Sequence, residues 1–88
     1  MPAPASTALI VVDMQNAFIA PATGAPVDGA KETLAAVNDW VAYADRRGWR
    51  IFYTRDVAPL ELPDGDPDHQ AELHPDLDVR GTVVPKGP

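Results

Sequence analysis

Ala8-Leu-Ile-Val-Val-Asp13 is the stretch of sequence that decides the fold. Its aliphatic residues follow one another without polar alternation, which is typical of a strand buried on both faces of a parallel sheet. The run ends at a carboxylate, and in open α/β sheets ligands bind beyond the carboxyl ends of the strands. The stretch therefore predicts an α/β fold in which Asp13 lies at the edge of the sheet where a site would form.

A helix and a second strand are expected next. Apolar residues recur three and four positions apart between residues 29 and 47, which predicts an amphipathic helix. Asp28 is its expected N-cap, and Gly48 fits the left-handed position after its last turn. The apolar stripe consists of Ala30, Leu34, Val37, Val41 and Ala44. Residues 49–54 are rich in aromatic and β-branched side chains and predict the second strand, parallel to the first because the joins are short.

The remaining segments have weaker patterns. Residues 1–6 are expected to form a loose tail, residues 17–27 a loop, and residues 57–80 a long irregular loop of a length that is often functional. Thr82-Val-Val84 predicts a third short strand. The expected architecture is a partial three-layer Rossmann-like α/β sandwich, with about three parallel strands and one main helix in a single domain over residues 1–88.

Charge and composition exclude several classes of protein. The net charge is −6, with 13 acidic and 7 basic residues, so nucleic-acid binding through phosphate neutralisation is not expected. No apolar run is long enough to span a membrane, and no signal peptide is expected. The absence of cysteine favours a reducing compartment, so a cytoplasmic location is predicted. Glycine-rich motifs for dinucleotides are also lacking.

Charged residues stand at the ends of the three predicted strands. Asp13, Asp56 and Lys86 are expected at one edge of the sheet, because the carboxyl ends of parallel strands meet there. Asp13 and Lys86 could form an ion pair. With a nucleophile between them, the carboxylate would take its proton and the lysine would stabilise the anion. The alternative is that each residue only ends a strand and faces water, and the pattern alone favours this alternative.

Four segments, in this order along the chain, resemble the isochorismatase-like cysteine hydrolases, the family of the nicotinamidase and isochorismatase type. The segments are Ala8 to Phe18 with its Asp-Met-Gln-Asn motif, Phe52-Tyr-Thr-Arg-Asp56, Ala71-Glu-Leu-His-Pro-Asp-Leu77 and Val83-Val-Pro-Lys-Gly87. Together they cover nearly the whole chain. The resemblance implies that the chain is the N-terminal half of such a hydrolase, and a truncated product, a fragment or an early stop is expected.

The resemblance implies a Cys-Asp-Lys triad. Asp13 would be the general base, and Lys86 would stabilise the thiolate. Phe18 would line the substrate pocket, while Gln15 and Asn16 would brace the loop. The family's activity implies hydrolysis of an amide or a related C–N or ether bond in a small metabolite such as nicotinamide. The family carries its cysteine in the second half of the fold and this sequence has none, so the chain alone is expected to be inactive.

The metal motif of the family's nicotinamidases is incomplete in this sequence. These enzymes bind a divalent metal through Asp-x-His after the second strand and through further histidines, whereas Asp56-Val-Ala58 lacks the histidine. Asp56 and His69 are left as weak candidate ligands, too few for a divalent cation. No metal or other cofactor is therefore expected. His74 is expected to be a structural residue of its loop.

Three hypotheses follow for the function. The first is an incomplete hydrolase, which would act on a small-molecule substrate if complemented by the missing half. The second is a non-catalytic remnant or interaction module that pairs through an exposed sheet edge, by self-association or with a complementary polypeptide. The third is a small flavodoxin-like ligand binder, for which the sequence offers no phosphate loop.

Overall fold

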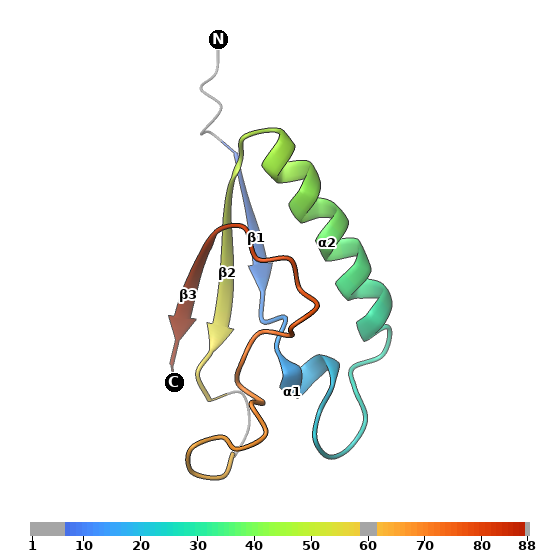
Figure 1. The fold of residues 1–88 in the computed structure, drawn as a ribbon, viewed down its shortest axis with the longest axis vertical. Helices are drawn as coiled ribbons and strands as arrows, with labels where there is room; N and C mark the ends of the chain where they lie inside the picture. Colours follow the sequence, from blue (N-terminus) through green and yellow to red (C-terminus); the bar gives the residue numbers. More distant parts are fainter. Residues whose placement is uncertain (1–6, 59–61, 88) are drawn as a thin grey trace.

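The structure is a computed structural model that describes residues 7–58 and 62–87. A parallel sheet and one long helix dominate it (Figure 1). The elements in chain order are β1 (Ala8–Val12), α1 (Asn16–Ile19), α2 (Ala30–Arg46), β2 (Arg50–Asp56) and β3 (Thr82–Lys86). The α/β class, with three parallel strands and one main helix, is confirmed. The predicted tail at residues 1–6 lies outside the described residues.

The three strands lie in the order β1-β2-β3, so β2 is the middle strand. Val12 pairs in register with Thr54 on β2, and Asp56 at the end of β2 pairs with Lys86 on β3. The strands therefore end together at one edge of the sheet. Asp13, which directly follows β1, lies at this edge, as the sequence predicted.

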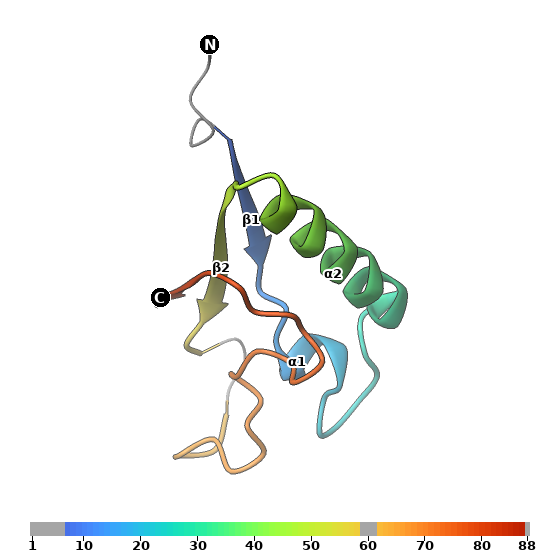
Figure 2. The same cartoon turned by 45° about the horizontal axis from the view of Figure 1, so that its top comes forward.

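One face of the sheet is covered by α2 and by the segment that leads into β3 (Figure 2). The core on this face includes Val11, Ile51 and Tyr53 from the strands, Leu34, Val41 and Ala44 from α2, and Leu77 from the segment before β3. Tyr53 and Val41 have no exposed surface. Because side chains alternate along a strand, every second residue of β1 and β2 points into this core.

The opposite face of the sheet is open to solvent in the part of the chain that the structure describes. Ile10 and Val12 on β1 are 61% and 58% exposed, and Val84 on β3 is 43% exposed. Phe52 and Thr54 on the middle strand share this face by register. The described residues thus form two of the three expected layers. β1 is apolar on both sides but is covered on only one.

α2 follows the predicted apolar stripe. Its buried residues are Ala30, Leu34, Val41 and Ala44, and Val37 is partly buried. Gly48 after the helix has a φ of 73°, the predicted left-handed conformation. The predicted N-cap is wrong: Gly29 takes this position with a φ of 71°, and none of the described side chains caps the helix. Glycine adopts this conformation at little cost, so the chain turns into α2 one residue after Asp28.

The predicted loop at residues 17–27 begins with a short helix, and the prediction is wrong there. α1 forms because Phe18 N and Ile19 N both donate to the Gln15 carbonyl oxygen at 3.1 Å, and because Ala17 and Ile19 are buried. One turn is too short to show an apolar period, so the pattern could not reveal it.

Among the helices of the described chain, none combines the length and hydropathy that crossing a bilayer requires.

The long loop before β3 is irregular, as predicted, over its described residues. Between residues 62 and 80 the backbone forms turns and one isolated bridge, in which Leu73 pairs with Gln15. The loop ends at Gly81, where a Cβ atom would lie 2.0 Å from the Ile51 carbonyl oxygen. Only glycine fits this close approach, which allows β3 to begin beside β2.

Candidate active site

An ion pair lies at the carboxyl edge of the sheet. Lys86 Nζ is 3.0 Å from Asp13 Oδ2. The two residues belong to the ends of β3 and β1, which β2 separates, so the pair crosses the middle strand. The structure therefore brings together the two residues for which the sequence suggested a shared role.

Solvent reaches this ion pair. The side chains of Lys86 and Asp13 are 47% and 24% exposed. Pairs that water reaches contribute only about 0–1 kcal/mol to stability, so this one adds little to the fold. Its position at the carboxyl ends of parallel strands is the place where α/β sheets bind their ligands.

Thr54 on β2 holds the other oxygen of the Asp13 carboxylate. The Thr54 hydroxyl donates to Asp13 Oδ1 at 2.9 Å, and the Asp13 amide donates to Thr54 Oγ1 at 3.2 Å. The same amide donates to the Thr54 carbonyl oxygen at 3.1 Å. Thr54 was not predicted from the sequence. Its position in the resembling Phe52-Tyr-Thr-Arg-Asp56 segment, one strand away from Asp13, was the available signal.

Gln15 joins the strand ends to the long loop from a fully buried position. Its Nε2 donates to the carbonyl oxygens of Asp56 and Ala71, at 2.7 Å each, and its Oε1 accepts from Asp56 N at 3.0 Å. Both amide hydrogens are used, so the burial leaves no donor unpaired. The interpretation of Gln15 as a brace for the loop is confirmed.

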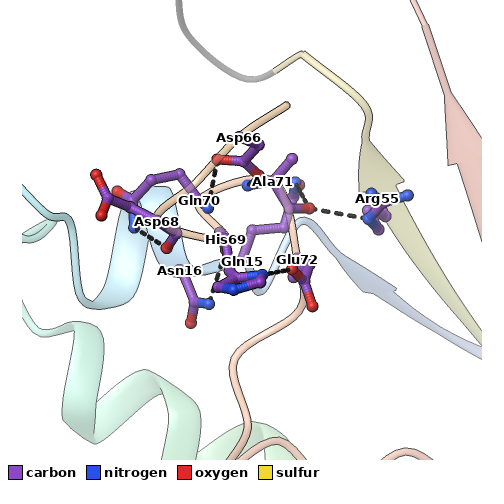
Figure 3. Close-up of polar contacts among 9 residues, drawn as sticks. All are labelled: Gln15, Asn16, Arg55, Asp66, Asp68, His69, Gln70, Ala71 and Glu72. Atoms are coloured by element: carbon purple, nitrogen blue, oxygen red, sulfur yellow. Dashed lines mark hydrogen bonds and ion pairs between the residues drawn. The ribbon is translucent and has the colours of Figure 1, made fainter. Parts of the chain in front are cut away.

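The loop segment 69–74 lies against the Asp-Met-Gln-Asn motif (Figure 3). Asn16 Nδ2 donates to the His69 carbonyl oxygen at 2.9 Å, and Asn16 N donates to the Glu72 carbonyl oxygen at 2.9 Å. Arg55 Nε adds a bond of 2.9 Å to the Ala71 carbonyl oxygen. Asn16 therefore braces the loop as well, as the sequence analysis expected.

Asp66 shapes the turn that presents this loop segment. Its carboxylate accepts from the amides of Gln70 and Ala71, at 2.8 Å each (Figure 3). The hydrogen bond from the Ala71 amide is the main cause that lowers the pKa of Asp66, and the Gln70 amide acts in the same direction. The backbone at Asp66 and His69 is left-handed, with φ of 46° and 55°. The turn thus aims the Ala71 carbonyl at Gln15 and Arg55.

Tyr53 fixes the segment that leads into β3. Its buried hydroxyl donates to the Asp78 carbonyl oxygen at 2.7 Å and accepts from Arg80 N at 2.9 Å. Burial raises the pKa of Tyr53. The Arg80 guanidinium pairs with Asp45 and Asp78 at 2.8 Å each. These contacts set the start of β3, and through β3 they set the position of Lys86.

Phe18 lies near Asp13, and its role in a substrate pocket stays a prediction. Both residues line a hollow of about 110 Å³. Ligand pockets commonly measure about 300–1,000 Å³, so this hollow has room for only part of a ligand. Within residues 7–58 and 62–87, the chain contributes one wall beside Asp13.

The two weak metal candidates make separate local contacts. Asp56 Oδ1 accepts from Ala58 N at 2.9 Å, and His69 Nδ1 pairs with the Glu72 carboxylate. Among the described residues, no group of three His, Cys, Asp or Glu side chains could hold a metal ion. His74 Nδ1 accepts from Asp76 N at 3.0 Å, which is a contact within its own turn.

Comparison with known proteins identifies the family. The family model described as Isochorismatase domain matches residues 7–86. This range contains β1, α2, β2 and β3 as well as both members of the ion pair. The chain belongs to the isochorismatase family.

Individual relatives agree with this assignment. The nicotinamidase of Saccharomyces cerevisiae is 45% identical over 51 residues, which are 58% of this chain and 24% of that protein. A protein from Oleispira antarctica assigned as an isochorismatase hydrolase has a TM-score of 0.76 at 26% identity, over 99% of this chain and 49% of its own. The pyrazinamidase of Pyrococcus horikoshii, solved in complex with zinc, has a TM-score of 0.68 at 27% identity, over 91% of this chain and 51% of its own.

The chain spans only part of these relatives. It covers about half of the two solved structures and about a quarter of the yeast nicotinamidase. The matched fold therefore extends in the relatives beyond the elements seen here. The open face of the sheet, with Ile10 and Val12 exposed, fits a chain that holds part of that fold.

Proposed function

We propose that this chain supplies the proton-accepting part of an isochorismatase-type hydrolase that cleaves an amide or a related C–N or ether bond in a small metabolite such as nicotinamide. The observation that carries the proposal is the Asp13–Lys86 ion pair, 3.0 Å long, at the carboxyl edge of the sheet and inside the matched range. The relatives named nicotinamidase and pyrazinamidase support an amide substrate.

The two charged groups have complementary tasks in this reaction. A cysteine thiol placed beside the pair would lose its proton to Asp13 Oδ2, and the Lys86 ammonium would stabilise the thiolate. The thiolate would then attack the carbonyl carbon of the substrate to form a thioester, while the amine leaves with the proton that Asp13 had accepted. Water would hydrolyse the thioester in a second step and release the carboxylic acid and the thiol. Phe18 would hold the apolar side of the substrate next to Asp13.

The nucleophile has to come from outside these 88 residues, because the sequence contains no cysteine. We propose that a complementary polypeptide segment carries it and joins the sheet at the edge of β1 that no other described strand occupies. The hollow along this edge measures about 280 Å³ and is lined by Leu9, Ile10, Val11, Val12, Met14, Thr33, Val37 and Trp40. An unpaired strand edge with apolar neighbours is the kind of surface to which a further strand adds.

A second candidate function uses the same edge without catalysis. In this alternative the chain is an interaction module that pairs with a partner, or with a second copy, through β1. The exposure of Ile10 and Val12 favours it, because contiguous apolar surface on a sheet face is typical of an interface.

A chimera separates the two functions. Residues 7–86 would replace the corresponding segment of the Pyrococcus horikoshii pyrazinamidase, and ammonia release from nicotinamide and pyrazinamide would be measured. We expect turnover, with a loss of about 10²–10⁴-fold in Asp13→Asn and Lys86→Met. Asp39→Asn and Lys31→Met, on the exposed side of α2, are the matched controls and should keep full activity.

Two results would decide against the hydrolase. One is a folded chimera whose turnover survives Asp13→Asn, because the base would then be another group. The other is a folded chimera with no turnover, which would favour the interaction module. The 88-residue chain alone serves as the blank and should release no ammonia, since it has no nucleophile.

A further inference from the structure

Asp13 determines where the hydrogen of the Thr54 hydroxyl points. A hydroxyl group has one hydrogen to donate and lone pairs that accept. The Asp13 amide donates to Thr54 Oγ1 at 3.2 Å, which occupies an accepting position. The hydrogen is therefore free to point at Asp13 Oδ1, 2.9 Å away. The two residues are joined by bonds in both directions.

The bonds to Thr54 offset backbone strain at Asp13. Its φ of 54° is left-handed, which costs energy in a residue other than glycine, although Asp tolerates it better than most. The turn directs the side chain back over the end of β2, where Thr54 lies. The amide bond to the Thr54 carbonyl oxygen and the hydroxyl bond to the carboxylate hold Asp13 in this conformation.

The carboxylate consequently has two different oxygens. Oδ1 accepts from the Thr54 hydroxyl, whereas Oδ2 lies 3.0 Å from Lys86 Nζ. The hydroxyl bond occupies Oδ1 and fixes the rotation of the carboxylate, so Oδ2 is the oxygen that stays turned toward Lys86. Thr54 lies on β2, the middle strand, between the strands whose ends carry the ion pair.

We propose that Thr54 is a positioning residue for the general base: its hydroxyl fixes the Asp13 carboxylate so that Oδ2 alone, beside Lys86, receives the proton of the nucleophile. The proposal rests on the function proposed above. A role in packing alone would require only the shape of the side chain, and valine has nearly the same shape. The positioning role requires the hydroxyl, which serine retains.

The test uses the 88-residue chain and a water-soluble carbodiimide as the probe. The reagent activates the Asp13 carboxyl group, Lys86 Nζ attacks its carbonyl carbon, a C–N bond replaces the C–O bond, and the substituted urea leaves. The product, an Asp13–Lys86 isopeptide, is measured by mass spectrometry of peptides. We expect Thr54→Ser to cross-link within about twofold of the parent and Thr54→Val at least about threefold more slowly, because a directed hydrogen bond to a charged group is lost. Lys86→Arg should give no cross-link.

Two outcomes would overturn the proposal. One is cross-linking of Thr54→Val at the parental rate, and the other is Thr54→Ser as slow as Thr54→Val. Unfolding temperatures of the parent and of the Thr54→Ser, Thr54→Val and Lys86→Arg variants check that the fold is kept. If Thr54→Val unfolds, the proton spectrum of the parent decides: the Thr54 hydroxyl should be protected from exchange and show a contact with the Asp13 amide, and a freely exchanging hydroxyl would contradict the proposal.

Neither the cross-linking rate nor the proton spectrum depends on turnover, so the positioning role of Thr54 and the hydrolase function can fail separately. In the chimera, Thr54→Val should lower kcat about tenfold with little change in KM, and Thr54→Ser should restore it. If the cross-link depends on Thr54 but the chimera is inactive, the positioning role is supported and the hydrolase proposal is contradicted. If the chimera is active and depends on Asp13 but tolerates Thr54→Val, the hydrolase proposal is supported and the positioning role is contradicted.

Discussion

The two faces of the sheet differ although both are apolar in sequence. Val11 is 5% exposed under α2, while its neighbour Val12 is 58% exposed on the other face. The continuous aliphatic run of β1 is typical of a strand covered on both sides, and the described residues cover one. The aliphatic pattern of β1 therefore predicts that both of its faces need apolar neighbours. Which elements supply those neighbours is decided by the whole fold and not by the strand segment itself.

The largest loss of stability is expected from a substitution at Gly81, where β3 begins beside β2. Gly81→Ala places a Cβ atom 2.0 Å from the Ile51 carbonyl oxygen, and backbone cannot yield there without moving β3 away from β2. We expect a loss of about 4–5 kcal/mol in the free energy of unfolding, enough to unfold a small domain. Urea unfolding measures it. Gly87→Ala, whose Cβ would meet only a side-chain atom at 3.7 Å, is the control and should change stability little.

Truncating neighbouring residues of β1 compares the two faces directly. Val11→Ala should cost about 2 kcal/mol, because it removes buried methyl groups and leaves a cavity against α2. Val12→Ala should cost less than about 0.5 kcal/mol, since its side chain already contacts water. Thermal or urea unfolding of both variants provides the values. Equal losses would mean that the open face is covered in solution.

A charge on the open face should change association more than stability. If β1 recruits a second copy or another strand, Val12→Lys should weaken self-association about tenfold or more, because a lysine on an edge strand opposes pairing. Analytical ultracentrifugation over a range of concentrations measures this effect. Val79→Lys, at a valine that is 44% exposed in the loop before β3, is the matched control. A parent chain that is monodisperse and monomeric would remove the basis of the prediction.

The smallest change in stability is expected from Asp66, in the loop beside the candidate site. The folded pKa of Asp66 is lowered by the two backbone amides that it accepts from. The carboxylate therefore adds stability above its unfolded pKa of about 3.9, and this contribution is lost as the pH falls through the lower folded pKa. Asp66→Asn should flatten the decline in stability between neutral and acidic pH. Asp64→Asn, an exposed neighbour, should leave the decline unchanged.

The sequence predicted most of the elements because their signals are local. The aliphatic run of β1 and the stripe of α2 are periodic over enough residues to be recognised, and Gly48 marks the end of the helix. α1 was missed because four residues carry no period. Asp28 was wrongly assigned as the N-cap because propensity favoured it, whereas the chain uses the conformational freedom of Gly29 at this turn.

The candidate site was predicted only in part, and the reason is geometric. Asp13 and Lys86 could be placed because each follows or ends a strand, and parallel strands end together. Their contact is now seen, while their chemical roles stay predictions. The hydrogen bonds of Thr54 and Tyr53 depend on strand register and on turns far along the chain, so no local sequence pattern predicts them.

The buried amide of Gln15 has a consequence for the order of folding. Its partners, Asp56 and Ala71, lie 41 and 56 residues further along the chain. A polar group buried before those partners arrive would lose its bonds to water without compensation. Collapse around Gln15 is therefore unfavourable until β2 and the long loop are both in place. The motif that holds Asp13 thus couples the maturation of the site to completion of the fold, and the two should appear in a single slow, cooperative kinetic phase.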